Sequence, residues 1–189
     1  FRSRSDLASR SIGYGKAAMV FHMLRTMAGD ELFFAALKQL IETKQFRSAS
    51  WEDIKTVFEK QLGKDLSAFF KEWLDGKGLP EVRVEKASVL RKSGKFEIAI
   101  DVVRKNSAIP LDLPVAVSYL RGGGKKDVMV LDADKKSISL LVDEEPATAV
   151  IDGEYDLARK PTTDEMPPVI ARLLGDEAPV IAATEAGIN

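Results

Sequence analysis

The feature that most constrains the fold of this chain is a change of hydrophobic period at Pro80. Before Pro80, apolar residues recur at the spacing of amphipathic helices, and after it they alternate with polar residues as in half-buried strands. Gly76 and Gly78 stand at the change, where glycine and proline end the helical pattern. The sequence therefore predicts an α+β fold in which a helical segment precedes an antiparallel β-sandwich.

Two helices are predicted between Tyr14 and Thr43. The first ends at Gly29 and is apolar nearly all round, which is typical of a helix inside a larger protein. Asp30 offers an N-cap carboxylate for the second helix. The inward stripe of this second helix has helical spacing and consists of Phe33, Leu37, Leu40 and Ile41.

Two shorter helices are predicted before Pro80. Ser50 and Asp53 resemble a capping box for a helix that ends at Gly63, and Asp65 is expected to cap the last helix. The apolar stripe of the first of these helices is Ile54, Val57, Phe58 and Leu62. The stripe of the second is Leu66, Phe69, Phe70, Trp73 and Leu74.

Six or seven short strands are predicted after Pro80, without helices between them. They cover residues 82–90, 96–102, 113–120, 127–131, 137–142 and 147–151. Turn signals separate them, and the glycines of residues 122–124 are expected to form a hairpin loop. The predicted organisation is a helical segment over 1–79, a sandwich domain over 80–160, and a linker, a short helix and the start of a further element over 161–189.

Composition argues against several classes of partner. The 189 residues carry a formal net charge of −1, which gives no electrostatic reason to bind nucleic acid or an anionic membrane. No apolar run reaches the roughly 18 residues of a membrane span. The first residues lack the apolar core of a signal peptide, so a soluble chain of undetermined compartment is expected. Cysteine is absent, which excludes disulfides and thiolate chemistry.

His22 is the only histidine, so the chain cannot contain a two-histidine zinc motif such as H-E-x-x-H. Its place among apolar residues favours a structural histidine, and we expect this chain to bind no metal or cofactor by itself. Tyr14 begins the first helix. The residue pattern alone favours a packed ring whose hydroxyl bonds a backbone carbonyl.

Four segments before Pro80 carry a more specific pattern. They are the run from Tyr14 to Arg25 (YGKAAMVFHMLR), the group Gly29-Asp30-Glu31, the group Ser50-Trp51-Glu52-Asp53, and the run from Leu66 to Pro80. In this order they resemble the zinc aminopeptidases of the aminopeptidase N type. That family often writes its first motif Tyr-Glu-Lys-Gly, whereas Gly15 and Ala17 stand at the second and fourth places here.

The resemblance implies that residues 1–79 close a thermolysin-like catalytic domain that acts on peptides. It also implies a catalytic role for Tyr14, whose hydroxyl would donate a hydrogen bond to the oxyanion formed from the peptide carbonyl. In the family the zinc ligands precede the tyrosine motif, so they would lie before Phe1. The chain is thus expected to be a carboxyl-side fragment that needs the upstream zinc-binding half and is inactive alone.

Two other interpretations remain open at this point. The chain could be an interaction or scaffold module of a metallopeptidase-like protein that has lost its zinc site. It could also be a structural or adhesive protein with Tyr14 in its core, which predicts a first helix fully buried by residues 30–80. The fragment interpretation predicts instead an exposed apolar face around Met19, Phe21 and Met23, which a second copy could cover.

Overall fold

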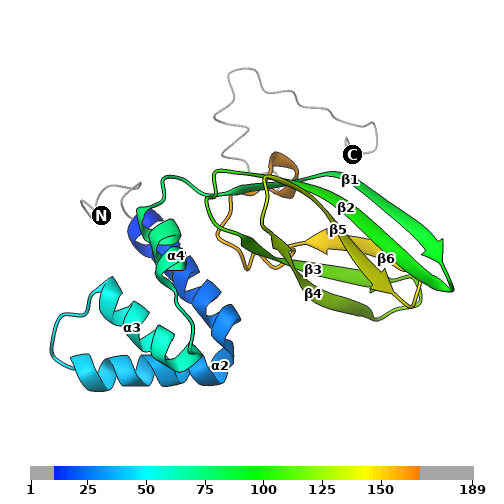
Figure 1. The fold of residues 1–189 in the computed structure, drawn as a ribbon. Helices are drawn as coiled ribbons and strands as arrows, with labels where there is room; N and C mark the ends of the chain where they lie inside the picture. The colour runs from blue at the N-terminus through cyan, green and yellow to red at the C-terminus, as the bar shows by residue number, and fades with distance from the viewer. Residues whose placement is uncertain (1–10, 167–189) are drawn as a thin grey trace, which may run out of the picture.

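The computed structural model describes residues 11–166 and places the helices at one end of the molecule and the strands at the other (Figure 1). A single crossing of the chain, between the last helical turn and the first strand, joins the two ends. The predicted α+β architecture, with a helical segment before a β-sandwich, is confirmed.

The first two predicted helices form α2 (Ala17–Lys44), which is kinked where the first was expected to end. Gly29 has a φ of 72° at the kink, a left-handed value that glycine adopts at little cost. A π-helical turn, Ser11–Lys16, precedes α2 and carries Tyr14. The predicted break at Gly29 is therefore confirmed. Gly29 is the one residue of α2 with non-helical backbone angles, and the helix continues directly after it.

Local capping explains where the next helices begin. At the start of α3 (Trp51–Leu62), the Ser50 hydroxyl accepts from the Asp53 amide at 3.2 Å, and Asp53 accepts from the Ser50 amide at 2.8 Å. α4 (Ser67–Phe70) continues into a π-helical turn, Lys71–Asp75. Its first amide, of Ser67, donates to the Asp65 carboxylate at 2.8 Å. The capping box of Ser50 is confirmed, whereas the N-cap of α4 is Leu66, and Asp65 accepts the Ser67 amide from one residue earlier. The Asp30 carboxylate bonds Arg25.

Aromatic contacts fill the space between these helices. The rings of Phe33 and Phe58 lie 5.6 Å apart, and those of Phe69 and Trp73 lie 6.3 Å apart. The predicted stripes of α3 and α4 face this core, but Ile41 of the α2 stripe is 63% exposed. The inward assignment of Ile41 is therefore wrong, because α3 packs on another face of this half of α2, where Gln61 bonds Gln39.

The apolar face predicted around Met19, Phe21 and Met23 is not exposed. Met23 is only 7% exposed, and Met19 and Phe21 pack half-buried against the core. Trp51 of α3 covers this face, with its ring 5.7 Å from that of Phe21. The expected exposed face is therefore wrong, and with it the reason to place a dimer contact there.

Six antiparallel strands follow, in two three-stranded sheets of order β1-β2-β5 and β4-β3-β6. The strands are β1 (Glu81–Lys92), β2 (Lys95–Lys105), β3 (Leu111–Tyr119), β4 (Gly124–Leu131), β5 (Lys135–Val142) and β6 (Pro146–Ile151). Gly122 and Gly123, with φ of 90° and 78°, turn the chain between β3 and β4, so the predicted hairpin loop is confirmed. The sheets lie face to face in Figure 1.

Alternation along the strands builds the sandwich interior. Alternate side chains of β2, β3 and β5 point inward and are buried: Ile98, Ile100, Val102, Leu111, Leu113, Val115, Val117, Ile138, Leu140 and Val142. Full burial of such a side chain stabilises a fold by about 1.5–3 kcal/mol relative to its exposure. A shift of one residue in strand pairing would move these side chains to the solvent face, so their burial fixes the register of the sheets.

A charged network closes the sandwich after β6. Arg159 is 6% exposed, and its Nε donates to the carboxylate of Asp152 at 2.6 Å. The same guanidinium makes two bonds to Glu165, of 2.9 and 2.6 Å. Glu165 lies in a 3₁₀ turn, Thr163–Glu165, where only a polar linker was predicted. The short helix predicted after Pro167 and the further element toward Asn189 lie outside the described residues.

This network predicts a pH dependence of stability. The hydrogen bonds from Arg159 lower the pKa of Glu165 to about 2, whereas a free glutamate titrates near about 4.3. A lowered native pKa stabilises the fold above pH of about 4.3, and this contribution is lost as the pH falls toward about 2. In chemical denaturation, Glu165→Gln should be less stable than wild type at pH 7, and the difference should shrink across this window.

The neighbouring Asp164→Asn provides the matched control, because Asp164 is an exposed carboxylate of the same turn. It should leave the pH profile of the unfolding free energy unchanged. A Glu165→Gln profile parallel to that of wild type would contradict the assignment of the ion pair.

Candidate functional site

Tyr14 lies on the surface of the described structure. Its side chain is 58% exposed, in the turn directly before α2. Val20 and Leu24, further along the same helix, are fully buried, so α2 is held by one face while its first turn remains accessible. The interpretation of Tyr14 as a core tyrosine in a fully buried helix is therefore wrong, whereas its catalytic role remains a prediction.

The turn that carries Tyr14 is anchored close by. Lys16 Nζ donates to the carbonyl oxygen of Gly76 at 3.1 Å, which joins the start of α2 to the end of the helical part. These residues are 60 positions apart in the sequence. The tyrosine thus projects from a helix end that is tied to the chain segment leading into the sandwich.

His22 lies on the exposed side of α2 rather than among apolar side chains. Its side chain is 44% exposed, and its Nε2 lies 2.7 Å from Oδ1 of Asp156, in the segment after β6. Ala18, one turn before His22, is also exposed. His22 therefore has a structural partner, as expected, but at the contact between the helices and the sandwich.

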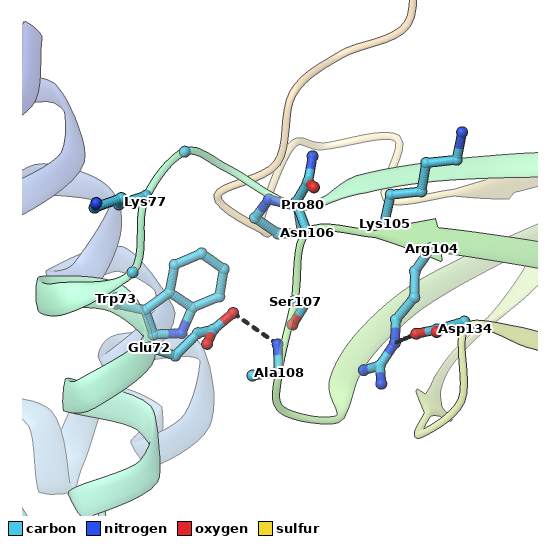
Figure 2. A pocket seen from close by; sticks show the side chains of 12 residues that line it. Glu72, Trp73, Lys77, Pro80, Arg104, Lys105, Asn106, Ser107, Ala108 and Asp134 are labelled. Atoms are coloured by element: carbon cyan, nitrogen blue, oxygen red, sulfur yellow. Dashed lines mark hydrogen bonds and ion pairs between the residues drawn. The ribbon is translucent and has the colours of Figure 1, made fainter.

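A cavity of about 600 Å³ lies where the helical part meets the sandwich (Figure 2). On one side Glu72 and Trp73 line it, and on the other lies the segment from Arg104 to Ala108. The Glu72 carboxylate accepts from the Ala108 amide at 3.2 Å, so this side chain bridges the two parts.

Arg104 forms the opposite wall of this cavity. It is buried, and its guanidinium donates to the carbonyl oxygens of Ile109 and of Leu131, the latter at 3.1 Å. Its Nε lies 3.5 Å from Oδ1 of Asp134, as Figure 2 shows. Three charged groups of the cavity, those of Glu72, Arg104 and Asp134, are thus engaged in contacts within the fold, and we assign them a structural role.

Sequence reasoning missed several of these residues, and only one carried a readable signal. Arg104 follows Ile98, Ile100 and Val102 at every second position of β2, so strict alternation places it on the buried face. Asp156 and Asp152 lie beyond the last strand, where no hydrophobic period marks them. Their partners could not be found from spacing, because each contact joins segments that are distant in the chain or bent by a turn.

The residues of this chain do not fit a zinc site. Within residues 11–166, no group of three or more His, Cys, Asp and Glu side chains could hold a metal ion. The whole sequence has a single histidine and no cysteine. Among the same described residues, no helix is both long and apolar enough to cross a membrane.

Comparison with known proteins supports the pattern seen before Pro80. Residues 5–73 match the Peptidase family M1 domain. Aminopeptidase N of Lactococcus lactis subsp. lactis is 35% identical over 81 residues, which cover 43% of this chain and 10% of that protein. Probable aminopeptidase 2 of Sulfurisphaera tokodaii is 28% identical over 137 residues, or 70% of this chain and 17% of that protein.

A solved structure agrees in fold. The aminopeptidase A of Legionella pneumophila, determined in complex with aspartic acid, superposes with a TM-score of 0.65 over 79% of this chain. The sequence identity is 17%, so this likeness supports the fold alone. The matched part is 17% of that chain, and the present chain spans only a small share of each of these relatives. The match to the Peptidase family M1 domain thus lies in the helical part of this chain, which holds Tyr14 and the segments singled out in the sequence.

Proposed function

We propose that this chain acts as part of a zinc-dependent aminopeptidase, to which it contributes an oxyanion-stabilising tyrosine. The observation that carries the proposal is the family match over residues 5–73, which includes Tyr14 and the helices that hold it. In this proposal residues 1–79 complete the catalytic domain, residues 80–160 form a supporting sandwich domain, and residues 161–189 lead to a further element. The substrates are peptides, as the names of the relatives suggest.

The surroundings of Tyr14 suit a hydrogen-bond donor. A phenol hydroxyl is a neutral group that can donate to an oxyanion without a change of its own charge. Tyr14 is accessible, and α2 behind it is fixed by the buried Val20 and Leu24. A donor held in place in this way stabilises developing negative charge with little reorganisation. Its accessibility is what a group that meets substrate requires.

The proposal assigns zinc binding to residues outside this chain. The single histidine and the absence of a metal-binding group within residues 11–166 are the reasons. When bound, zinc would polarise the scissile carbonyl in such an enzyme. Residues of the present chain would then supply only the donor and its support.

The isolated 189-residue chain should therefore have no peptidase activity. Hydrolysis of aminoacyl anilides, measured with and without added zinc, tests this expectation. The matched reference is a longer protein that contains both this sequence and a zinc-binding segment. Zinc-dependent turnover by the isolated chain would contradict the proposed division of roles.

In that longer protein, Tyr14→Phe should lower kcat by about 100- to 1000-fold with little change in KM. The reason is that loss of one oxyanion donor costs about 2.7–4 kcal/mol of transition-state stabilisation. Tyr155→Phe is the control, since it also removes one hydroxyl, from an exposed tyrosine of the sandwich end. It should leave kcat unchanged.

Equal turnover of wild type and Tyr14→Phe would contradict the catalytic role of Tyr14. A longer protein that neither binds zinc nor hydrolyses peptides would favour the alternative function, an interaction or scaffold module of a metallopeptidase-like protein. The two outcomes can be distinguished: in the first the Tyr14→Phe enzyme is fully active, and in the second even the wild-type protein is inactive.

A further inference from the structure

One side-chain contact joins the exposed side of α2 to the segment after β6. His22 Nε2 and Asp156 Oδ1 lie 2.7 Å apart, although the two residues are 134 positions apart in the sequence. Other charged groups beside them are paired elsewhere. Arg25 bonds Asp30 at 2.7 Å, and Lys126 bonds Glu154. The hydrogen bond of Asp156 thus goes to His22, while these two cations bond other carboxylates.

The segment that presents Asp156 is held from within. The Leu157 amide donates to Asp152 Oδ1 at 3.1 Å, and the Tyr155 amide donates to the Asp152 carbonyl at 3.1 Å. Arg159 clamps the other carboxylate oxygen of Asp152 at 2.6 Å. Because Asp152 is only 1% exposed, these bonds form away from water. These bonds hold the backbone on both sides of Asp156, whose carboxylate faces His22 of α2.

The contact lies on the half of α2 that follows the turn carrying Tyr14. His22 follows Tyr14 by eight residues, which span about 12 Å of helix. Lys16 gives this half of α2 its second polar anchor, at the Gly76 carbonyl. The two polar contacts, of Lys16 with Gly76 and of His22 with Asp156, restrain the segment from which Tyr14 projects.

We propose that Asp156 is a positioning residue, which through His22 fixes the first half of α2 and thereby the hydroxyl of Tyr14. This inference rests on the proposed function of Tyr14, and Asp156 itself touches no reacting atom. It assigns the sandwich a role in catalysis beyond support. The Asp152–Arg159 pair orders the segment, Asp156 engages His22, and the helix transmits the constraint to the site.

Kinetics of the longer enzyme test the proposal. Asp156→Ala should lower kcat by about threefold to tenfold, the range expected for a single net hydrogen bond, and KM should stay within about twofold of wild type. Asp156→Asn keeps an acceptor for His22 Nε2–H and should recover most of the turnover. Glu144→Ala removes an exposed carboxylate from the loop between β5 and β6, away from His22, and is the control that should leave kcat unchanged.

A double-mutant cycle separates the contact from unrelated effects of each change. His22→Ala and Asp156→Ala should each lower kcat, and the double variant should be no slower than the slower single one, because they remove the same interaction. Additive losses would overturn the proposal. Unchanged kcat in Asp156→Ala, beside a strong loss in Tyr14→Phe, would refute the positioning role while the proposed function stands. No loss in Tyr14→Phe would instead refute the proposed function.

A second measurement uses the 189-residue chain and needs no activity. Hydrogen–deuterium exchange of the peptide that spans Tyr14 to Ala28 should be faster in Asp156→Ala than in wild type, because local opening becomes easier. Glu144→Ala should match wild type. Equal protection in Asp156→Ala and wild type would show that the contact does not hold α2, and the proposal would fall.

Discussion

A buried ion pair, Asp152–Arg159, is the interaction on which the junction of this structure depends. Removal of two charges from water costs several kcal/mol per ion, and excellent geometry is needed to offset it. Here both carboxylate oxygens of Asp152 are occupied, and Arg159 also binds Glu165 through two nitrogens. Burial raises the pKa of Asp152, and the bonds from Arg159 and Leu157 oppose that rise. The pair thus converts a loop beyond the last strand into a rigid part of the sandwich.

The contacts between the helical part and the sandwich are of a different kind. The helices close around aromatic rings, and the sheets close around alternating aliphatic side chains. Two contacts between them are polar and directional: His22 with Asp156, and Glu72 with the Ala108 amide. Hydrophobic burial is non-directional and would hold the two parts together in several ways. Hydrogen bonds are directional and favour one orientation of the two parts, which suits the role proposed for Tyr14.

Much of the local structure was predictable because it depends on neighbours in the sequence. The capping box of Ser50 and Asp53 and the left-handed Gly29 each need only a few consecutive residues. The strands were predicted from the alternation of apolar and polar residues. Arg104 lies at a position that this alternation places on the buried face of β2. Ile41 and the face of Met19, Phe21 and Met23 were misassigned, because their exposure depends on where α3 packs. A hydrophobic stripe marks a face that favours burial, but it does not say which neighbour covers which part of it.

The same division holds for the site. The sequence by itself determined the family pattern, the position of Tyr14 at a helix start and the lack of a histidine pair for zinc, because these are properties of residue type and spacing. Only the tertiary structure decided that Tyr14 is exposed and that His22 meets Asp156. The physical reason is that a hydrogen bond across 134 residues leaves no periodic trace in a sequence. Such a contact exists only once the helices and the sheets have each folded and come together.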